Sequence, residues 1–199
     1  MKKEKRPYSM STRAESATQT EQSIMHAMVA LWMEIPLSQI TLEKIAERAG
    51  VTVRTILRKF GSKEDLLEAS LQHDASTIEQ TRNKVPVGDV AEALNVLLTE
   101  YEQMGEAVVR TIVLENELPG ARKILDRGRA YHRQWCALVF EPYLPDSGSD
   151  AYEIKLAAFI AATEIYLWKL LRKDLQKSHD ETRQVFRLLV EGLIRSPHP

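Results

Sequence analysis

The sequence predicts an all-α fold of about nine helices. Apolar residues recur at a helical spacing, as in the stripe formed by Ile24, Ala27, Met28, Leu31 and Trp32. Capping residues, prolines and glycines separate such stretches, and no alternation typical of a β-strand is sustained. Leucine, alanine, glutamate, arginine and lysine are abundant, and these residue types favour helices.

A polar and basic arm over residues 1–17 comes first, and we expect it to be mobile. At its end, Thr12 and Glu15 have the spacing of a capping box, which predicts the start of the first helix. Pro36 ends that helix because proline interrupts a helical hydrogen-bond ladder.

Two short helices follow, each with its own cap. Thr41 is a good N-cap for the second helix, and Gly50 suits the left-handed C-cap at its end. Thr52 can begin a third helix two residues later, and this helix runs to about Phe60 before Gly61 ends it. Two helices of this length with so tight a connection have the anatomy of a helix-turn-helix.

The remaining helices are longer. Ser62 and Asp65 have the spacing of a cap for the fourth helix, which runs toward Lys84 and breaks at Pro86. Capping signals and apolar periodicity then place helices over about residues 89–104, 108–114, 119–138, 150–174 and 178–195.

The composition is that of a soluble globular protein. The 199 residues are 44% hydrophobic and 28% charged, and the unbroken apolar run over 156–162 is far shorter than a membrane-spanning helix. No apolar segment of a secretory signal follows the basic residues near the start. Cys136 is the single cysteine, which excludes an internal disulfide. We therefore expect a cytoplasmic protein with no membrane partner.

The net charge of −1 conceals an uneven distribution. Residues 1–63 hold eleven Lys/Arg and six Glu, a net charge of +5, and the rest of the chain carries −6. Within the basic part, residues 52–63 include Arg54, Arg58, Lys59 and Lys63 and contain no acidic residue. Phosphate contacts need such positive charge, and an arginine can also donate two hydrogen bonds to a guanine edge. A basic face that is merely solvated is the alternative interpretation.

Residues 40–67 resemble the DNA-binding signature of TetR-type (TetR/AcrR) transcriptional regulators. The matching positions are Thr41, Ile45, Ala46, Ala49, Gly50, Val51, Thr52, Thr55, Ile56, Phe60, Lys63 and Leu66. The resemblance implies a homodimeric repressor that a small-molecule effector releases from a double-stranded DNA operator. It implies a DNA-binding domain over residues 18–78, with a helix-turn-helix at about 41–60 and a connecting helix. Residues 79–199 would then be the helical domain for effector binding and dimerisation.

The resemblance also carries over the positions that would face DNA. They are Thr41, Thr52, Val53, Arg54, Thr55, Leu57, Arg58, Lys59 and Lys63. Lys59 and Lys63 would contact phosphate, and Arg54 would read a base. Arg54 and Arg58 share a helix face. Val53 could contact a thymine methyl group.

Leu57 departs from the family pattern, which usually has a tyrosine there that reaches the DNA backbone. Periodicity alone would place Leu57 on a buried stripe with Val53, Ile56 and Phe60, whereas the resemblance turns it toward DNA. Whether Leu57 lies in the core or at the DNA stays open at this point.

The stretch over residues 156–171 is apolar on all sides and must be covered on all sides. A second copy of the chain could cover it, as could other helices of the same chain, and we favour the dimer because two-fold dimers are the commonest oligomers. The expected interface residues are Ala157, Ile160, Ala161, Glu164, Trp168, Leu171, Val185 and Leu189.

An effector pocket is expected among the central helices, apolar with a few polar anchors, for a largely apolar or aromatic molecule. The candidate residues are Tyr101, Met104, Glu115, Asn116, Tyr131, Trp135, Thr163 and Tyr166. Ordinary core packing is the alternative explanation for each of them.

The sequence gives little support for a metal site, a cofactor or catalysis. His132 and Cys136 lie one helical turn apart, but nothing nearby completes a metal site, so we expect no metal and no cofactor. The basic residues 2–6 could follow a minor groove or could be a solvated tail. No catalytic motif is present, and we expect no enzyme. The alternatives are a helix-turn-helix regulator whose carboxy-terminal domain binds a protein partner, or a helical enzyme or carrier.

Overall fold

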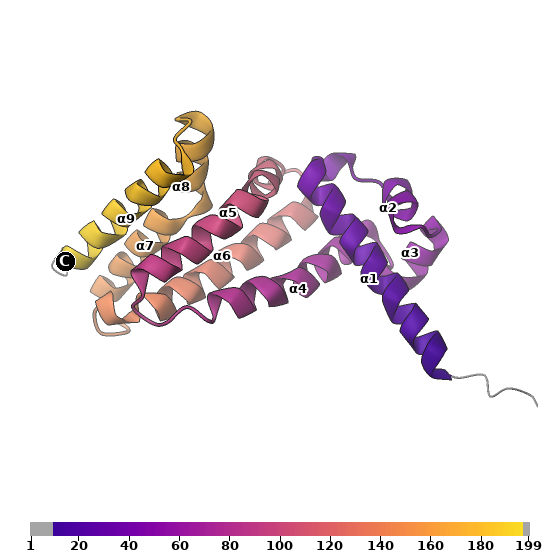
Figure 1. Cartoon of the computed structure of the whole chain (residues 1–199), viewed down its shortest axis with the longest axis horizontal. Coiled ribbons are helices and arrows are strands. Elements are labelled where there is room, and N and C mark those ends of the chain that lie inside the picture. Colours follow the sequence, from indigo (N-terminus) through magenta and orange to yellow (C-terminus); the bar gives the residue numbers. More distant parts are fainter. Residues whose placement is uncertain (1–9, 197–199) are drawn as a thin grey trace, which may run out of the picture. The chain divides into compact units, whose positions relative to one another are not determined.

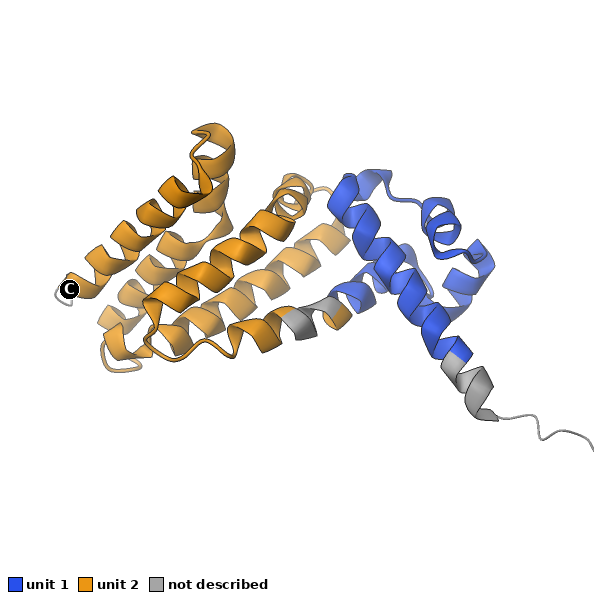
Figure 2. Cartoon of the chain, viewed as in Figure 1, with its two compact units in different colours: residues 1–71 blue, residues 72–199 orange. Residues whose placement is uncertain are grey.

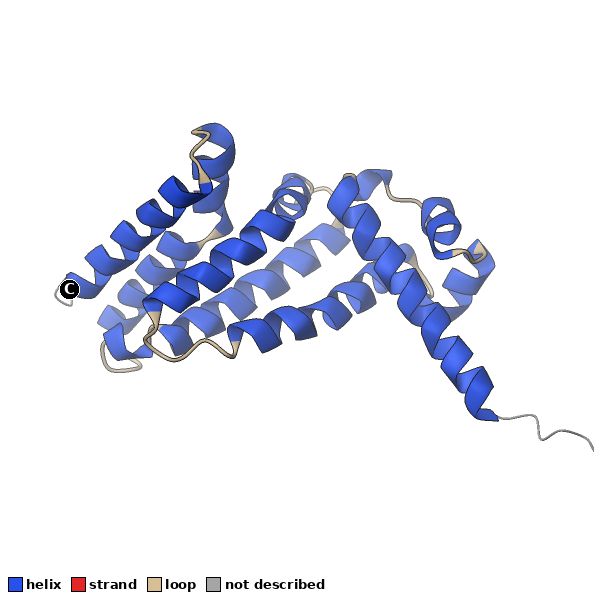
Figure 3. Ribbon diagram, in the orientation of Figure 1, coloured by secondary structure: helices blue, strands red, loops and turns tan. Residues whose placement is uncertain are grey.

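The computed structural model describes residues 10–196 of the chain, with side chains described for 16–73 and 78–196. Its helices are α1 (Met10–Glu34), α2 (Leu42–Ala49), α3 (Val53–Phe60), α4 (Lys63–Arg82), α5 (Val90–Val113), α6 (Pro119–Val139), α7 (Asp150–Thr163), α8 (Ile165–Lys169) and α9 (His179–Arg195) (Figure 1). Two short 3₁₀ turns and a π-helical turn, η3 (Leu170–Asp174), complete the regular structure. Residues 10–196 contain no strand, which confirms the all-α prediction (Figure 3).

The chain divides into two compact units, Met1–Leu71 and Gln72–Pro199 (Figure 2). Helix α4 starts in the first unit and ends in the second, and it also contains the boundary expected between residues 78 and 79. None of the described helices is long and apolar enough to cross a membrane.

The first unit packs α1, α2 and α3 around a small apolar core. Ile24 and Met28 of α1, Ile45 of α2, Ile56 of α3 and Leu66 of α4 are all fully buried. The stripe predicted along α1 is confirmed, because each of its five residues is buried. This core fixes which side of α3 turns inward.

Local caps set the ends of the short helices as predicted. The Thr41 hydroxyl accepts a hydrogen bond from the Lys44 backbone N–H (3.3 Å), and the Thr52 hydroxyl accepts one from Thr55 (3.2 Å). Gly50 adopts the left-handed conformation, with φ 66°.

The first helix starts earlier than expected. Its backbone is already helical at Met10, so Thr12 lies inside the helix and is not its N-cap. The basic residues 2–6, for which a minor-groove role was considered, lie outside the described residues.

Two predictions about the helices of the second unit were wrong. Residues 90–113 form one continuous helix, α5, instead of two, and Gly105 lies inside it against the ring of Trp168. The single helix expected over 150–174 is broken at Glu164, whose backbone is extended (ψ 151°). The break persists because the Glu164 carboxylate accepts from the Ile165 N–H (3.2 Å) and the Tyr101 hydroxyl donates to the Thr163 carbonyl (2.9 Å).

We expect Gly105→Ala to destabilise the protein by about 1–3 kcal/mol, because a Cβ there would overpack the core. That Cβ would lie 2.6 Å from the Trp168 ring, which is 2% exposed and is held by its N–H donating to Glu102 (2.9 Å). The control is Gly128→Ala in α6, where a Cβ meets nothing within 4 Å. Gly128→Ala should instead raise the stability by about 0.5–1 kcal/mol. Chemical denaturation measures both, and equal effects would contradict the packing argument.

Candidate functional site

Helix α3 has an inner and an outer face. Ile56 is fully buried on the inner face, and Phe60 is half-buried. Arg54 and Arg58 are exposed on the outer face, and Leu57 between them is 42% exposed. Leu57 is therefore not a core residue, and the open question about its direction is answered in favour of the outer face.

The outer face of α3 carries positive charge that the chain itself does not neutralise. Arg54 and Arg58 form no ion pair within the part of the chain that the structure describes. Helix α3 contains no acidic residue, so no carboxylate on the helix itself competes with a bound anion. The arrangement suits a polyanion that approaches this face.

The two lysines that were expected to contact phosphate have partners within the protein. Lys59 Nζ donates to the Ala17 carbonyl of α1 (3.0 Å) and lies 3.4 Å from a Glu21 carboxylate oxygen. Lys63 Nζ donates to the Ile40 carbonyl (3.1 Å), just before the start of α2. These bonds connect α3 to α1 and the start of α4 to the start of α2, so both lysines help to position the helix-turn-helix.

An ion pair that the sequence reasoning missed also fixes α2. Both terminal nitrogens of Arg48 donate to the Glu34 carboxylate of α1, at 2.8 and 2.7 Å. The guanidinium lowers the pKa of Glu34 below its ordinary value through this hydrogen bond. The partners are fourteen residues apart across a turn, so helical spacing does not predict the pair.

The remaining candidate DNA-facing residues lie around these caps. Thr41 and Thr52 are exposed at the starts of α2 and α3, and Val53 and Thr55 are half-buried. The Thr52 and Thr55 hydroxyls lie 3.0 Å apart. The structure thus places all the proposed DNA-facing residues on or beside α2, α3 and the start of α4.

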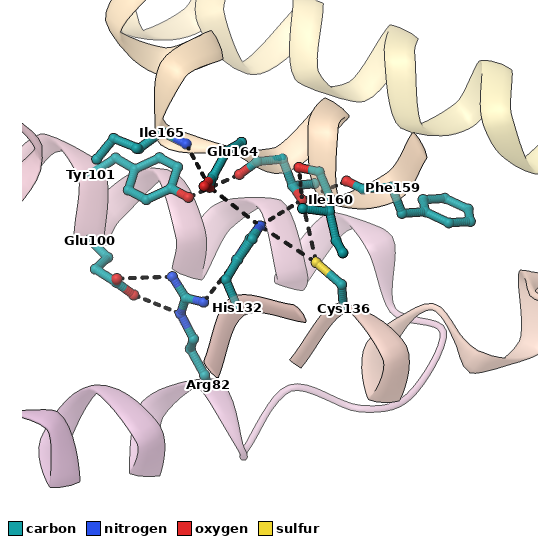
Figure 4. Close-up of polar contacts among 10 residues, drawn as sticks. Arg82, Glu100, Tyr101, His132, Cys136, Phe159, Ile160, Glu164 and Ile165 are labelled. Carbon is teal, nitrogen blue, oxygen red and sulfur yellow. Dashed lines mark hydrogen bonds and ion pairs between the residues drawn. The ribbon is translucent and has the colours of Figure 1, made fainter. Parts of the chain in front are cut away.

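A buried polar cluster occupies the second unit and begins with an ion pair (Figure 4). Arg82, whose side chain is 4% exposed, donates to both carboxylate oxygens of Glu100, at 2.8 and 2.9 Å. Its guanidinium also lies over the rings of Trp135 (4.8 Å) and Tyr131 (5.4 Å). The charge at the end of α4 is therefore held by α5 and α6 together.

His132 continues the cluster (Figure 4). Its Nδ1 lies 3.3 Å from Arg82 Nη1, and because arginine only donates, Nδ1 accepts and the proton lies on Nε2. Nε2 then donates to the Thr163 hydroxyl (3.1 Å), which itself donates to the Phe159 carbonyl (2.7 Å). Burial, and secondly the Arg82 charge, lower the pKa of His132 to about 3.

The His132 and Cys136 pair belongs to this cluster. The Cys136 sulfur lies 3.5 Å from His132 Nε2 and from the Thr163 hydroxyl, and burial raises the pKa of the thiol to about 12. Such a thiol is protonated at neutral pH and is a poor metal ligand. Among the described residues, no group of three or more His, Cys, Asp or Glu side chains could hold a metal ion.

The candidate effector residues fall into two groups. Tyr101, Trp135 and Thr163 are buried in or beside the polar cluster, Tyr131 has its ring against Arg82, and Met104 is half-buried on α5. The other three bond to arginine side chains: Arg129 donates to Glu115 and to the Tyr166 hydroxyl, and Arg122 donates to Asn116.

The candidate dimer residues also divide by burial. Trp168 and Leu171 are buried within this chain, and Ile160, Glu164 and Val185 are half-buried. Ala157 and Ala161 of α7 and Leu189 of α9 are exposed. Leu188, on the same helix, is 70% exposed.

We expect His132 to make the stability of the protein pH-dependent. The pKa is about 3 in the folded chain and near 6.5 when exposed, so the unfolded state takes up the proton first as the pH falls. The stability due to the neutral imidazole is complete above pH 6.5 and is lost toward pH 3, by at most about 1.4 kcal/mol per pH unit. Between pH 7 and pH 4, chemical denaturation should show a smaller loss in the free energy of unfolding for His132→Asn than for the wild type. Equal losses in the two proteins would refute this role of His132.

Comparison with known proteins finds a family model that matches part of the first unit. The family model of the bacterial regulatory proteins, tetR family, matches residues 24–70. A search of curated proteins found no match.

Solved structures with a similar fold include several regulators. A transcriptional regulator from Rhodococcus sp. Rha1 has a TM-score of 0.68 at 15% identity, over 88% of this chain and 96% of that one. A TetR transcription regulator from Haloarcula marismortui has a TM-score of 0.63 at 17% identity, over 87% and 96%. NalD, the secondary repressor of the MexAB-OprM multidrug efflux pump in Pseudomonas aeruginosa, has a TM-score of 0.61 at 21% identity, over 91% and 100%. These likenesses concern the fold, over most of the chain.

Proposed function

The amino-terminal domain of this chain belongs to the tetR family of bacterial regulatory proteins, and from this premise we propose that the chain is a repressor released from its operator by a small molecule. Members of this family are DNA-binding transcription factors and not enzymes. Repression, the effector and the dimer are the parts that we propose.

One observation carries the DNA-binding part of the proposal. Arg54 and Arg58 lie side by side on the exposed face of α3, the second helix of the helix-turn-helix. Their guanidinium groups have no carboxylate partner within the described residues, so no intramolecular ion pair has to break before they meet DNA. Such a helix enters the major groove, where an arginine can bind the edge of a guanine and the DNA phosphates attract the other positive side chains.

We propose that a second copy of the chain packs against α7 and α9. Exposed apolar side chains, Leu188 and Leu189 on α9 and Ile154 on α7, lie on these two helices, which pack against each other. Ala157 and Ala161 leave room for the close approach of a helix. Two helix-turn-helix units related by a two-fold axis would bind two half-sites one helical turn of DNA apart.

For the effector, we propose a largely apolar or aromatic molecule that binds in the second unit. The second unit buries Tyr101, Trp135 and Thr163 among its helices, and an interior of aromatic rings with a few polar groups is the kind of surrounding that such a molecule needs.

The test is selection of DNA from a random-sequence library by the full-length protein, followed by release. We expect the selection to enrich a pseudo-palindromic sequence. Among apolar compounds that raise the thermal stability of the protein, we expect some that release the protein from this DNA. Failure to enrich any sequence would refute the DNA-binding part. Enrichment without release by any stabilising compound would instead favour a protein partner for the second unit.

A further inference from the structure

The outer face of α3 contains a large apolar side chain that the protein covers only in part. Leu57 is 42% exposed, whereas its neighbour Ile56 is fully buried. It lies three residues after Arg54 and four after Val53, so these residues share one face of the helix. An exposed leucine stabilises the isolated protein little, and its surface is available to a partner.

The charge around Leu57 decides which partner fits. Arg54 and Arg58 flank it, α3 contains no acidic residue, and duplex DNA is the complementary polyanion. Leucine can neither donate nor accept a hydrogen bond, so it gains nothing from a phosphate or from the polar edge of a base. The apolar group that the major groove presents is the C5 methyl group of thymine.

Building on the proposed function, we propose that Leu57 is a specificity-determining residue that contacts the C5 methyl group of a thymine in the operator. The flanking arginines hold the helix in the groove, and Leu57 favours thymine at one position of each half-site. Val53 is half-buried on the same face and lies one helical turn before Leu57, so its contact would fall on a different base pair.

Uracil substitution tests this contact, because uracil keeps the pairing and groove edges of thymine and lacks only the methyl group. Each thymine of the selected operator is replaced in turn, and affinity is measured for the full-length wild type and Leu57→Ala. We expect one thymine per half-site at which uracil weakens wild-type binding about 3- to 10-fold. For Leu57→Ala the effect at that thymine should fall below about 2-fold, measured at low salt so that phosphate contacts keep binding measurable.

Val53→Ala is the matched control, since it shortens an apolar side chain on the same face and should keep the uracil effect at the Leu57 thymine. Thermal unfolding of Leu57→Ala should stay close to that of the wild type, because Leu57 lies outside the core and is 42% exposed. The inference is overturned when no uracil weakens wild-type binding, or when Leu57→Ala retains the full effect. Failure of the wild type to select any DNA would instead refute the proposed function.

Discussion

Replacing Arg82 with alanine is expected to lower the free energy of unfolding by about 3–5 kcal/mol, because it leaves the Glu100 carboxylate without its partner in the interior. Arg82 makes two hydrogen bonds to Glu100 and a third contact to His132, and its side chain is 4% exposed. The residue also lies at the end of α4, so the loss should loosen the attachment of that helix to α5 and α6.

The matched control is Arg133→Ala in α6. Arg133 also donates twice to a carboxylate, that of Glu153, but both side chains are about half exposed. Exposed pairs contribute about 0–1 kcal/mol, so this variant should change little. Chemical denaturation of both proteins gives the comparison. A loss for Arg82→Ala as small as that for Arg133→Ala would show that the buried pair does not hold the second unit together.

The second large effect is expected at the DNA. Replacing Arg54 and Arg58 together with alanine should weaken operator binding about 100-fold or more, since each bidentate arginine contact to guanine contributes about 1–3 kcal/mol. Both side chains are exposed and lack carboxylate partners within the described residues, so the stability should change by less than about 0.5 kcal/mol. Loss of DNA binding with an intact fold is the combined result to look for.

Single variants divide this effect further. Arg54→Ala should weaken binding to the selected operator more than to a scrambled duplex, whereas Lys63→Ala should weaken both evenly. Because Lys63 Nζ also donates to the Ile40 carbonyl, its loss should lower the stability as well, unlike that of Arg54. Gel shifts on both duplexes, with thermal unfolding alongside, measure this. Equal losses on both duplexes for Arg54→Ala would rule out its reading of a base.

The helix-turn-helix could be predicted well from the sequence because local signals determine it. The caps at Thr41 and Thr52 and the left-handed Gly50 act within a few residues of the chain. The resemblance added what periodicity could not give, since helical spacing alone places Leu57 on the buried stripe. Three-dimensional packing decided that Ile56, and not Leu57, turns inward.

The contacts that position the site could not be predicted in the same way. Lys59 reaches Ala17 across 42 residues, and Arg82 reaches His132 across 50, so no spacing rule connects them. The break at Glu164 depends on the Tyr101 hydroxyl, 62 residues from its acceptor. Such pairs follow from packing and not from local sequence.

The all-round apolar stretch shows the same limit. Trp168 and Leu171 of that stretch are covered by the chain itself, and the α7 side chains of Ala157 and Ala161 remain exposed. Apolar periodicity indicates that a helix is buried, but it does not show whether the same chain or a partner chain buries it.

The most direct test of the central claim is the salt dependence of DNA binding by the full-length protein. We predict that the logarithm of the affinity for the selected operator falls linearly with the logarithm of the salt concentration, with a slope of about −0.9 per phosphate contact. The operator should be bound about 10³-fold or more tightly than a scrambled duplex at the same salt. Binding that is weak at low salt, or equal for both duplexes, would contradict the assignment of α3 as the helix that reads DNA.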